Sequence, residues 1–136
     1  MIKVESRIKI IPFNVERVFY KLSDLNHLES VKGNIHSDKV QGMSFDRDTV
    51  TINMLGVGEI TLAIVEREPY KHIKFETTKS PLPFVVWIQL DPLSGERCKM
   101  RLIVNADVNP IMNNVLRKPL QNALEKMAEI LAEAQY

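Results

Sequence analysis

The chain has 136 residues, of which 45% are hydrophobic and 26% charged, and its 18 basic and 17 acidic side chains leave a formal net charge of +1. This length fits one domain that buries its own core, so we expect residues 1–136 to form a single domain. The near balance of charge excludes a general electrostatic attraction to nucleic acid, and no apolar run approaches the roughly 18 residues that would insert into a bilayer.

The first element predicted is a strand over residues 2–11, where polar and apolar residues alternate. Alternation with a period of two is typical of a half-buried strand, and it places Ile8 and Ile10 on the same buried face as Ile2. The same alternation leaves no continuous apolar segment of the kind found in signal peptides. With only one cysteine in the chain, we expect a protein of the reducing cytoplasm.

Short helices follow this strand. Asn14 is a suitable N-cap for a helix that runs to about Leu22, because its side chain can accept a hydrogen bond from the first helical turn. A second short helical turn then carries Leu25 and Leu28. The next segment, residues 30–39, is polar and contains a glycine, so we interpret it as a loop.

The middle of the chain alternates with a period of two almost throughout, and short turn sequences interrupt it. Short turns between consecutive strands indicate an antiparallel meander with one buried and one solvated face. The segment "LGVG", residues 55–58, is expected to be one of these turns. The strands are expected at residues 40–45, 49–54, 59–68, 70–78, 84–90 and 96–106.

The last segment predicts a long helix. Asn109 is a good N-cap and Pro110 takes the first helical position, where proline is favoured. At about 1.5 Å per residue, a helix of about 25 residues is on the order of 37 Å long, so only a broad sheet would bury its apolar stripe. The stripe comprises Met112, Leu116, Leu120, Ala123, Leu124, Met127, Ile130, Leu131 and Ala134.

Pro119 lies inside this helix, where it removes one backbone hydrogen bond and crowds the preceding turn. We expect the resulting bend to shape packing against the sheet. Two alternatives remain: Pro119 starts the main helix after a separate helical piece at 110–117, or the bend opens the mouth of a cavity.

In this order, three segments carry a resemblance to a known family: the strand–proline–helix entry "IKIIPFNVERVFYKLSDLNHL", the hairpin "VWIQLDPLSGERCKMRLIV" and the final helix opened by "NP". The chain resembles the SRPBCC superfamily, which includes START-like, Bet v 1-like and polyketide cyclase/dehydratase-like proteins. The resemblance implies an α+β helix-grip fold. In this fold a strongly curved seven-stranded antiparallel sheet wraps around the long C-terminal helix, and two short helices follow the first strand.

The resemblance also implies a cavity between the sheet and the C-terminal helix, which commonly takes an apolar or amphipathic small molecule. The residues that the period turns inward are nearly all apolar, and no paired acid and base is evident among them, which argues against general acid–base catalysis. The candidate lining residues are Met54, Leu62, Phe75, Ile88, Met100, Leu102, Val104, Leu116, Leu120 and Met127.

Residues with intrinsic chemistry are sparse, and they predict no catalytic, metal or cofactor site. The three histidines, His27, His36 and His72, have no spacing typical of zinc ligands. Cys98 has positively charged neighbours that favour a thiolate, but no histidine base is evident, so we interpret it as a passive strand residue.

Trp87 is the most informative aromatic residue. Its position in the alternation places it on the outer face of the sheet, next to Val85. An exposed apolar patch there would meet a protein partner or a second copy of the chain. The alternative, equally weighted, is that a neighbouring side chain such as Arg101 covers the indole.

Three functions remain open, in order of preference. The first is the binding or carriage of a small apolar or amphipathic molecule in the cavity. The second is an enzyme of the polyketide cyclase/dehydratase kind, and the third is an interaction module similar to the Hsp90-ATPase activators of the same superfamily. The outward Trp87 favours the third, and a buried polar pair would favour the second. Fold alone does not choose among them.

Overall fold

The computed structural model describes residues 2–28, 40–54, 58–134 and 136, with the backbone alone for Val40 and Met54. The loop expected at 30–39, with His36 in it, and most of the turn expected at 55–58 lie outside the described residues. The described elements are β1 (Ile2–Glu5), β2 (Lys9–Ile11), α1 (Val15–Leu22), β3 (Val40–Phe45), β4 (Thr49–Met54), β5 (Gly58–Glu68), β6 (His72–Lys79), β7 (Phe84–Pro92), β8 (Cys98–Ala106) and α2 (Pro110–Glu133).

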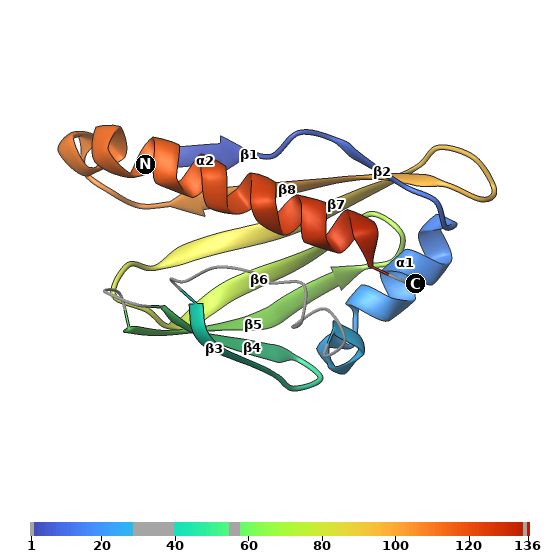
Figure 1. Ribbon diagram of the computed structural model, residues 1–136, viewed down its shortest axis with the longest axis horizontal. Coiled ribbons are helices and arrows are strands. Elements are labelled where there is room, and N and C mark those ends of the chain that lie inside the picture. Colours follow the sequence, from blue (N-terminus) through green and yellow to red (C-terminus); the bar gives the residue numbers. More distant parts are fainter. Residues whose placement is uncertain (1, 29–39, 55–57, 135) are drawn as a thin grey trace.

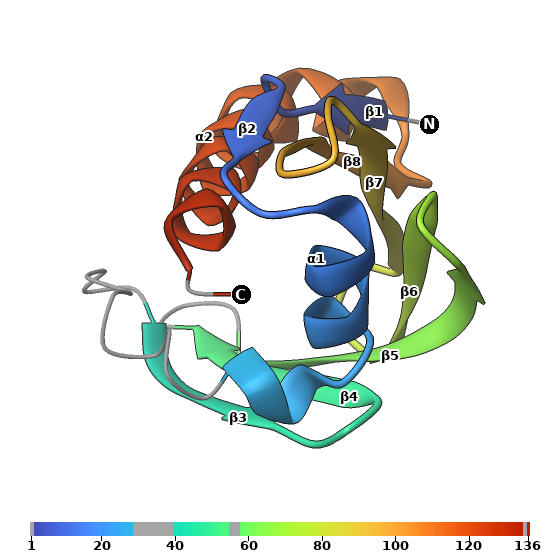
Figure 2. The ribbon, with the colours of Figure 1, turned by 90° about the vertical axis from the view of Figure 1, so that its right-hand side faces the viewer.

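The strands form one antiparallel sheet that curves around the long helix α2 (Figures 1 and 2). The strand order is β1-β8-β7-β6-β5-β4-β3, and β2 also pairs with β8. Since β1 and β2 lie along the same neighbour, they are two parts of one N-terminal strand, and the sheet has the seven rows that the resemblance implied. The predicted helix-grip fold is confirmed.

The N-terminal strand contains an irregularity that the alternation did not predict. Val4 lies opposite Val104, and Ile11 lies opposite Cys98. Seven residue steps separate Val4 from Ile11, whereas six separate their partners on β8. The N-terminal strand therefore carries one extra residue between β1 and β2, as in a β-bulge.

An extra residue reverses which side chains face the core, because the strand period is two. Ile8 and Ile10 are 57% and 54% exposed, so the prediction that they are buried was wrong. Ser6 lies just before the irregularity and is buried. Its backbone N–H donates to the Leu102 carbonyl at 2.8 Å, and its Oγ accepts from the Leu102 N–H at 2.9 Å.

The short helical elements lie where they were expected and close one end of the curved sheet (Figure 2). The Asn14 side chain caps α1 by accepting a hydrogen bond from the Arg17 N–H at 2.8 Å. A single 3₁₀ turn follows at residues 25–28, and it buries both Leu25 and Leu28.

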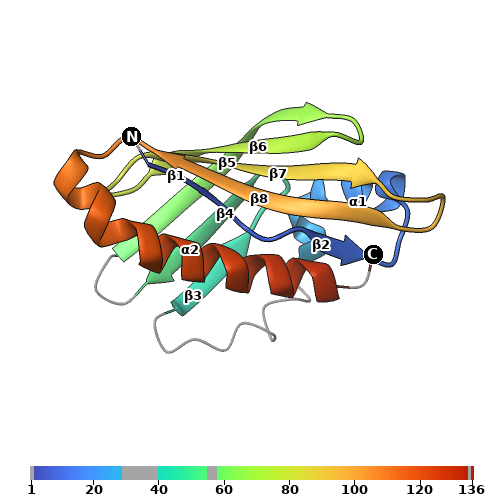
Figure 3. The same ribbon diagram turned by 90° about the horizontal axis from the view of Figure 1, so that it is seen from above.

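Helix α2 begins as predicted, with the Asn109 side chain accepting from the Met112 N–H at 2.8 Å. The helix is unbroken through Pro119, so the structure shows no separate piece at 110–117; its axis changes direction in the first half of the helix (Figure 3). Of the predicted apolar stripe, Leu124, Ile130 and Leu131 in the second half of the helix are buried, whereas Met112 near its start is 40% exposed and Leu116 and Leu120 are half-buried. The buried residues of the helix are Leu124, Ala128, Ile130 and Leu131. No helix in the described part of the chain is long and apolar enough to cross a membrane.

Candidate functional site

The candidate site is a cavity of ≈ 110 Å³ on the inner side of the sheet. Its walls come from the strands, from the second half of α2 and from the 3₁₀ turn at 25–28. The curvature of the sheet brings these distant segments around one space (Figure 2). The lining residues are Leu25, Leu28, Met43, Phe45, Val50, Ile52, Leu62, Phe75, Val86, Ile88, Leu102, Met127 and Leu131.

Half of the residues proposed from the sequence meet in this cavity. Leu62, Phe75, Ile88 and Leu102 line it from β5, β6, β7 and β8, and Met127 lines it from α2. These four strand residues are buried, with exposures of 2% to 9%. The alternation assigned their faces correctly because each strand keeps its period of two along this part of the sheet.

The other proposed residues do not line the cavity or are not described. Met100 and Val104 lie on β8, against which α2 packs, and they are buried parts of the core. Leu116 and Leu120 are half-buried and pack against the core from the first half of α2. The side chain of Met54 lies outside the described residues. The alternation along a strand or helix shows which side chains face the core, but it does not show where along that element the cavity lies.

Apart from Met54 on β4, no residue of the wall formed by β3 and β4 was among the predicted lining. Val50 and Ile52 share the face of Met54 in the alternation, so a signal for them was present. No pattern in the sequence shows how far the sheet margin curves back toward α2, and that curvature brings this wall to the cavity. The lining residues that the sequence did not predict are Leu25, Leu28, Met43, Phe45, Val50, Ile52, Val86 and Leu131.

Partly exposed lining residues mark where the cavity approaches solvent. Among the described lining residues these are Val86 on β7 and a group of four on the β3–β4 margin and α2, namely Met43, Phe45, Ile52 and Met127, and each packs against the core but keeps some exposure. We infer that the mouth lies between the β3–β4 margin and the second half of α2. Two methionines at this mouth give it flexible, polarizable side chains that adapt to different shapes.

The described residues of the cavity offer hydrophobic contact and no group for proton transfer. All thirteen described lining residues are apolar, and none is titratable. The buried Cys98 and Tyr136 do not line it. Burial raises the pKa of the Cys98 thiol to about 11, and the Glu16 carboxylate adds to this shift, so the thiol stays protonated and unreactive at neutral pH. Burial also raises the pKa of Tyr136, whose hydroxyl donates to the Leu131 carbonyl at 2.6 Å.

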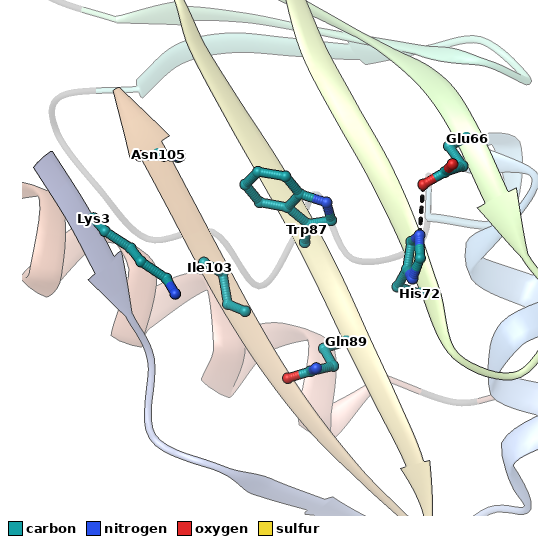
Figure 4. Close-up of a pocket in the computed structure, with 7 residues that line it drawn as sticks. All are labelled: Lys3, Glu66, His72, Trp87, Gln89, Ile103 and Asn105. Carbon is teal, nitrogen blue, oxygen red and sulfur yellow. Dashed lines mark hydrogen bonds and ion pairs between the residues drawn. The ribbon is translucent and has the colours of Figure 1, made fainter. Parts of the chain in front are cut away.

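A second hollow lies on the opposite, convex face of the sheet, around Trp87 (Figure 4). It has a volume of ≈ 390 Å³. Trp87 faces outward as predicted, and the side chain over its ring is Lys74, with Nζ 5.6 Å from the ring centroid. The residue suggested for this role, Arg101, instead donates to Gln89 Oε1 at 2.7 Å. The hollow is lined by Lys3, Glu66, His72, Trp87, Gln89, Ile103 and Asn105.

Comparison with protein families identifies one match over nearly the whole chain. The family described as "Polyketide cyclase / dehydrase and lipid transport" matches residues 1–135. A search of curated proteins finds no significant match.

Solved structures with the same fold have very different sequences. A START superfamily protein from Mycobacterium smegmatis superposes with a TM-score of 0.72 at 12% identity, covering 96% of this chain and 94% of its own. Norcoclaurine synthase from Thalictrum flavum, in complex with dopamine and hydroxybenzaldehyde, gives 0.72 at 11% identity, with 96% and 84% covered. A protein from Thermus thermophilus gives 0.63 at 18% identity, with 96% and 94% covered. At these identities the likeness shows the fold alone.

Proposed function

Because the chain belongs to the polyketide cyclase/dehydrase and lipid transport family of the SRPBCC superfamily, we propose that it binds and carries a small apolar molecule, or the apolar part of an amphipathic one, in the inner cavity. The observation that carries this proposal is the uniformly apolar lining. A ligand's polar group placed against such a wall would lose its hydrogen bonds to water without replacement, at a cost of about 1–3 kcal/mol. The lining therefore favours hydrocarbon.

The size of the cavity limits how much of a ligand it encloses. Sites that enclose a drug-sized molecule have volumes of about 300–1,000 Å³, whereas this cavity has ≈ 110 Å³. An engineered apolar cavity of about 150 Å³ holds benzene. We propose that the cavity encloses a molecule of that size, or the end of a longer chain whose remainder extends through the mouth beside Met127.

Binding is favoured over catalysis by the same lining. General acid–base catalysis needs a titratable side chain within hydrogen-bonding reach of the substrate, and the described lining residues provide none. A cyclase-like enzyme that acts by cavity shape alone remains the second candidate function. The homodimer or protein partner at the Trp87 face and the cytoplasmic location both remain predictions.

The first experiment is native mass spectrometry of the purified protein, followed by denaturing extraction and identification of any molecule that was bound. A stoichiometric hydrocarbon-rich molecule is the expected result. The protein is then stripped and titrated with alcohols and fatty acids of increasing chain length. A stripped protein that binds none of them would contradict the proposal.

Two neighbouring valines provide a matched pair of variants. Val86 lines the cavity from β7, whereas Val85 is turned to the other face of the same strand. Val86→Phe adds the same bulk as Val85→Phe but places it inside the cavity. We expect Val86→Phe to lower ligand affinity at least about ten-fold and Val85→Phe to leave it within about two-fold of the original. Equal effects of the two substitutions would place the ligand elsewhere.

A further inference from the structure

We propose that the convex face of the sheet carries a second binding site, for a small neutral aromatic molecule with an N–H or O–H donor, such as a phenol. The site is the outer hollow around Trp87, and it does not depend on the carrier function of the inner cavity. Its volume of ≈ 390 Å³ lies within the range of small-molecule sites, whereas that of the inner cavity does not.

The sheet itself separates the two sites. Trp87 lies on β7 between Val86 and Ile88, and both of these neighbours line the inner cavity. Successive side chains of a strand point to opposite faces, so the indole is directed away from the inner ligand. A molecule at Trp87 therefore contacts different atoms from any molecule between the sheet and α2.

The indole supplies an aromatic surface in the hollow. Trp87 pairs with Ile103 on β8 and with Lys74 on β6, so an aliphatic side chain and a lysine stem flank the ring. In Figure 4 the ring lies across the sheet, between the Lys3 and Ile103 side and the His72 and Glu66 side. Aromatic rings pack well against such a surface in offset or edge-on arrangements.

Asn105 supplies the preference for a donor. Its side-chain Oδ1 has no hydrogen-bond partner among the described residues and is closed off from solvent, so a ligand reaches it when the amide turns toward the hollow that Asn105 lines. A buried carbonyl oxygen without a partner is costly, so a group that donates to it gains more free energy than a hydrogen bond at an exposed position would. An aromatic N–H or O–H beside the indole satisfies this oxygen and covers the ring at the same time.

The charges around the hollow favour a neutral ligand. His72 Nε2 and Glu66 Oε2 lie 2.6 Å apart, and Lys3 Nζ lies 3.4 Å from Glu5 Oε1. Lys3 has a carboxylate partner and the Glu66 carboxylate has a hydrogen-bond partner in His72, which weakens the attraction of both charges for an ion. The amide oxygen of Gln89 is held by the Arg101 guanidinium. These contacts fix the walls before a ligand arrives, which lowers the entropy lost on binding.

The test uses the one tryptophan of the chain, whose indole N–H gives a single resonance in the ¹H–¹⁵N spectrum of labelled protein. Phenol and anisole are titrated separately. The two molecules share the ring and the oxygen, but only phenol donates a hydrogen bond. We expect phenol to shift the Trp87 resonance saturably in the millimolar range, with an affinity about five-fold higher than that of anisole.

Substitution then assigns the donor contact. Asn105→Leu is expected to remove the preference for phenol while anisole binding stays within about two-fold of wild type. If this variant fails to fold, the comparison of phenol with anisole on the wild-type protein still tests the hydrogen bond to Asn105. Equal affinities for phenol and anisole, no saturable shift, or a Trp87 shift that follows protein concentration alone would each overturn the proposal, and the last would assign the face to a second copy of the chain.

Discussion

Removing the hydroxyl of Ser6, which also donates to the Arg7 carbonyl at 3.0 Å, is expected to destabilise the protein chiefly through the buried Leu102 N–H. The Ser6 Oγ accepts from the Leu102 N–H at 2.9 Å, and Ser6 is 5% exposed, so water cannot readily replace it. In Ser6→Ala the Leu102 N–H is left without an acceptor, which costs about 1–3 kcal/mol. The unfolding entropy of a protein is about 2.1 cal/mol/K per residue. For a chain of 136 residues, this loss of stability therefore corresponds to a fall in Tm of roughly 3–10 °C.

The assay is urea and thermal unfolding followed by circular dichroism, with amide hydrogen exchange at Leu102 as a local readout. Ser44→Ala, at an exposed serine of β3, is the matched control and should change stability by less than about 0.5 kcal/mol. We expect Leu102 exchange to accelerate in Ser6→Ala and to stay unchanged in the control. A Ser6→Ala protein as stable as Ser44→Ala would refute the assigned role of the hydroxyl.

Three further changes test other parts of the structure. Leu131→Ala enlarges the inner cavity and should lower the free energy of unfolding, measured with urea, by about 2–5 kcal/mol. The variant should also bind bulkier hydrocarbons more tightly than wild type. Unchanged ligand selectivity would argue against this cavity as the binding site. The raised pKa of Cys98 means that the folded state favours the thiol, so its contribution to stability is complete below pH 9 and is lost as the pH rises toward 11. Cys98→Ala should flatten the dependence of unfolding free energy on pH over that range, and a slope equal to that of wild type would contradict this assignment. Pro119→Ala restores a helical hydrogen bond and should raise Tm. Pro119 is exposed and outside the cavity lining, so ligand affinity measured by titration should not change. A lower affinity would instead support the alternative that the bend opens the mouth of the cavity.

Helix α2 shows which features local sequence determines. Its start at Asn109 and Pro110 depends on hydrogen bonds and backbone angles within one turn, and both residues act as the sequence predicted. The burial of its apolar stripe depends on how far the sheet extends beneath it. Met112 of this stripe is 40% exposed and Leu116 and Leu120 are only half-buried, and no periodicity within the helix contains this information.

The N-terminal strand shows the same limit within a sheet. Apart from Ser6, apolar and polar residues alternate from Ile2 to Ile10, so the sequence predicted one regular strand. One extra residue between the two halves moved Ile8 and Ile10 to the solvent face. On the central strands the alternation assigned Leu62, Phe75 and Ile88 to the cavity face, although β5 and β6 pair with two register shifts. The lining residues described on β3 and β4 were missed, because their contribution depends on the curvature of the whole sheet.

The described part of the wall, which consists of apolar side chains alone, also limits how sharply the cavity discriminates between ligands. Without hydrogen bonds to a functional group, it separates two molecules by length and width alone. One methylene more or less changes affinity by about 10- to 200-fold, whereas sites that pair with a substrate hydroxyl reach about 10⁴- to 10⁵-fold. We therefore expect a graded preference across a homologous series. Single substitutions among side chains such as Leu62 or Ile88 would move the optimum along that series without creating or abolishing recognition.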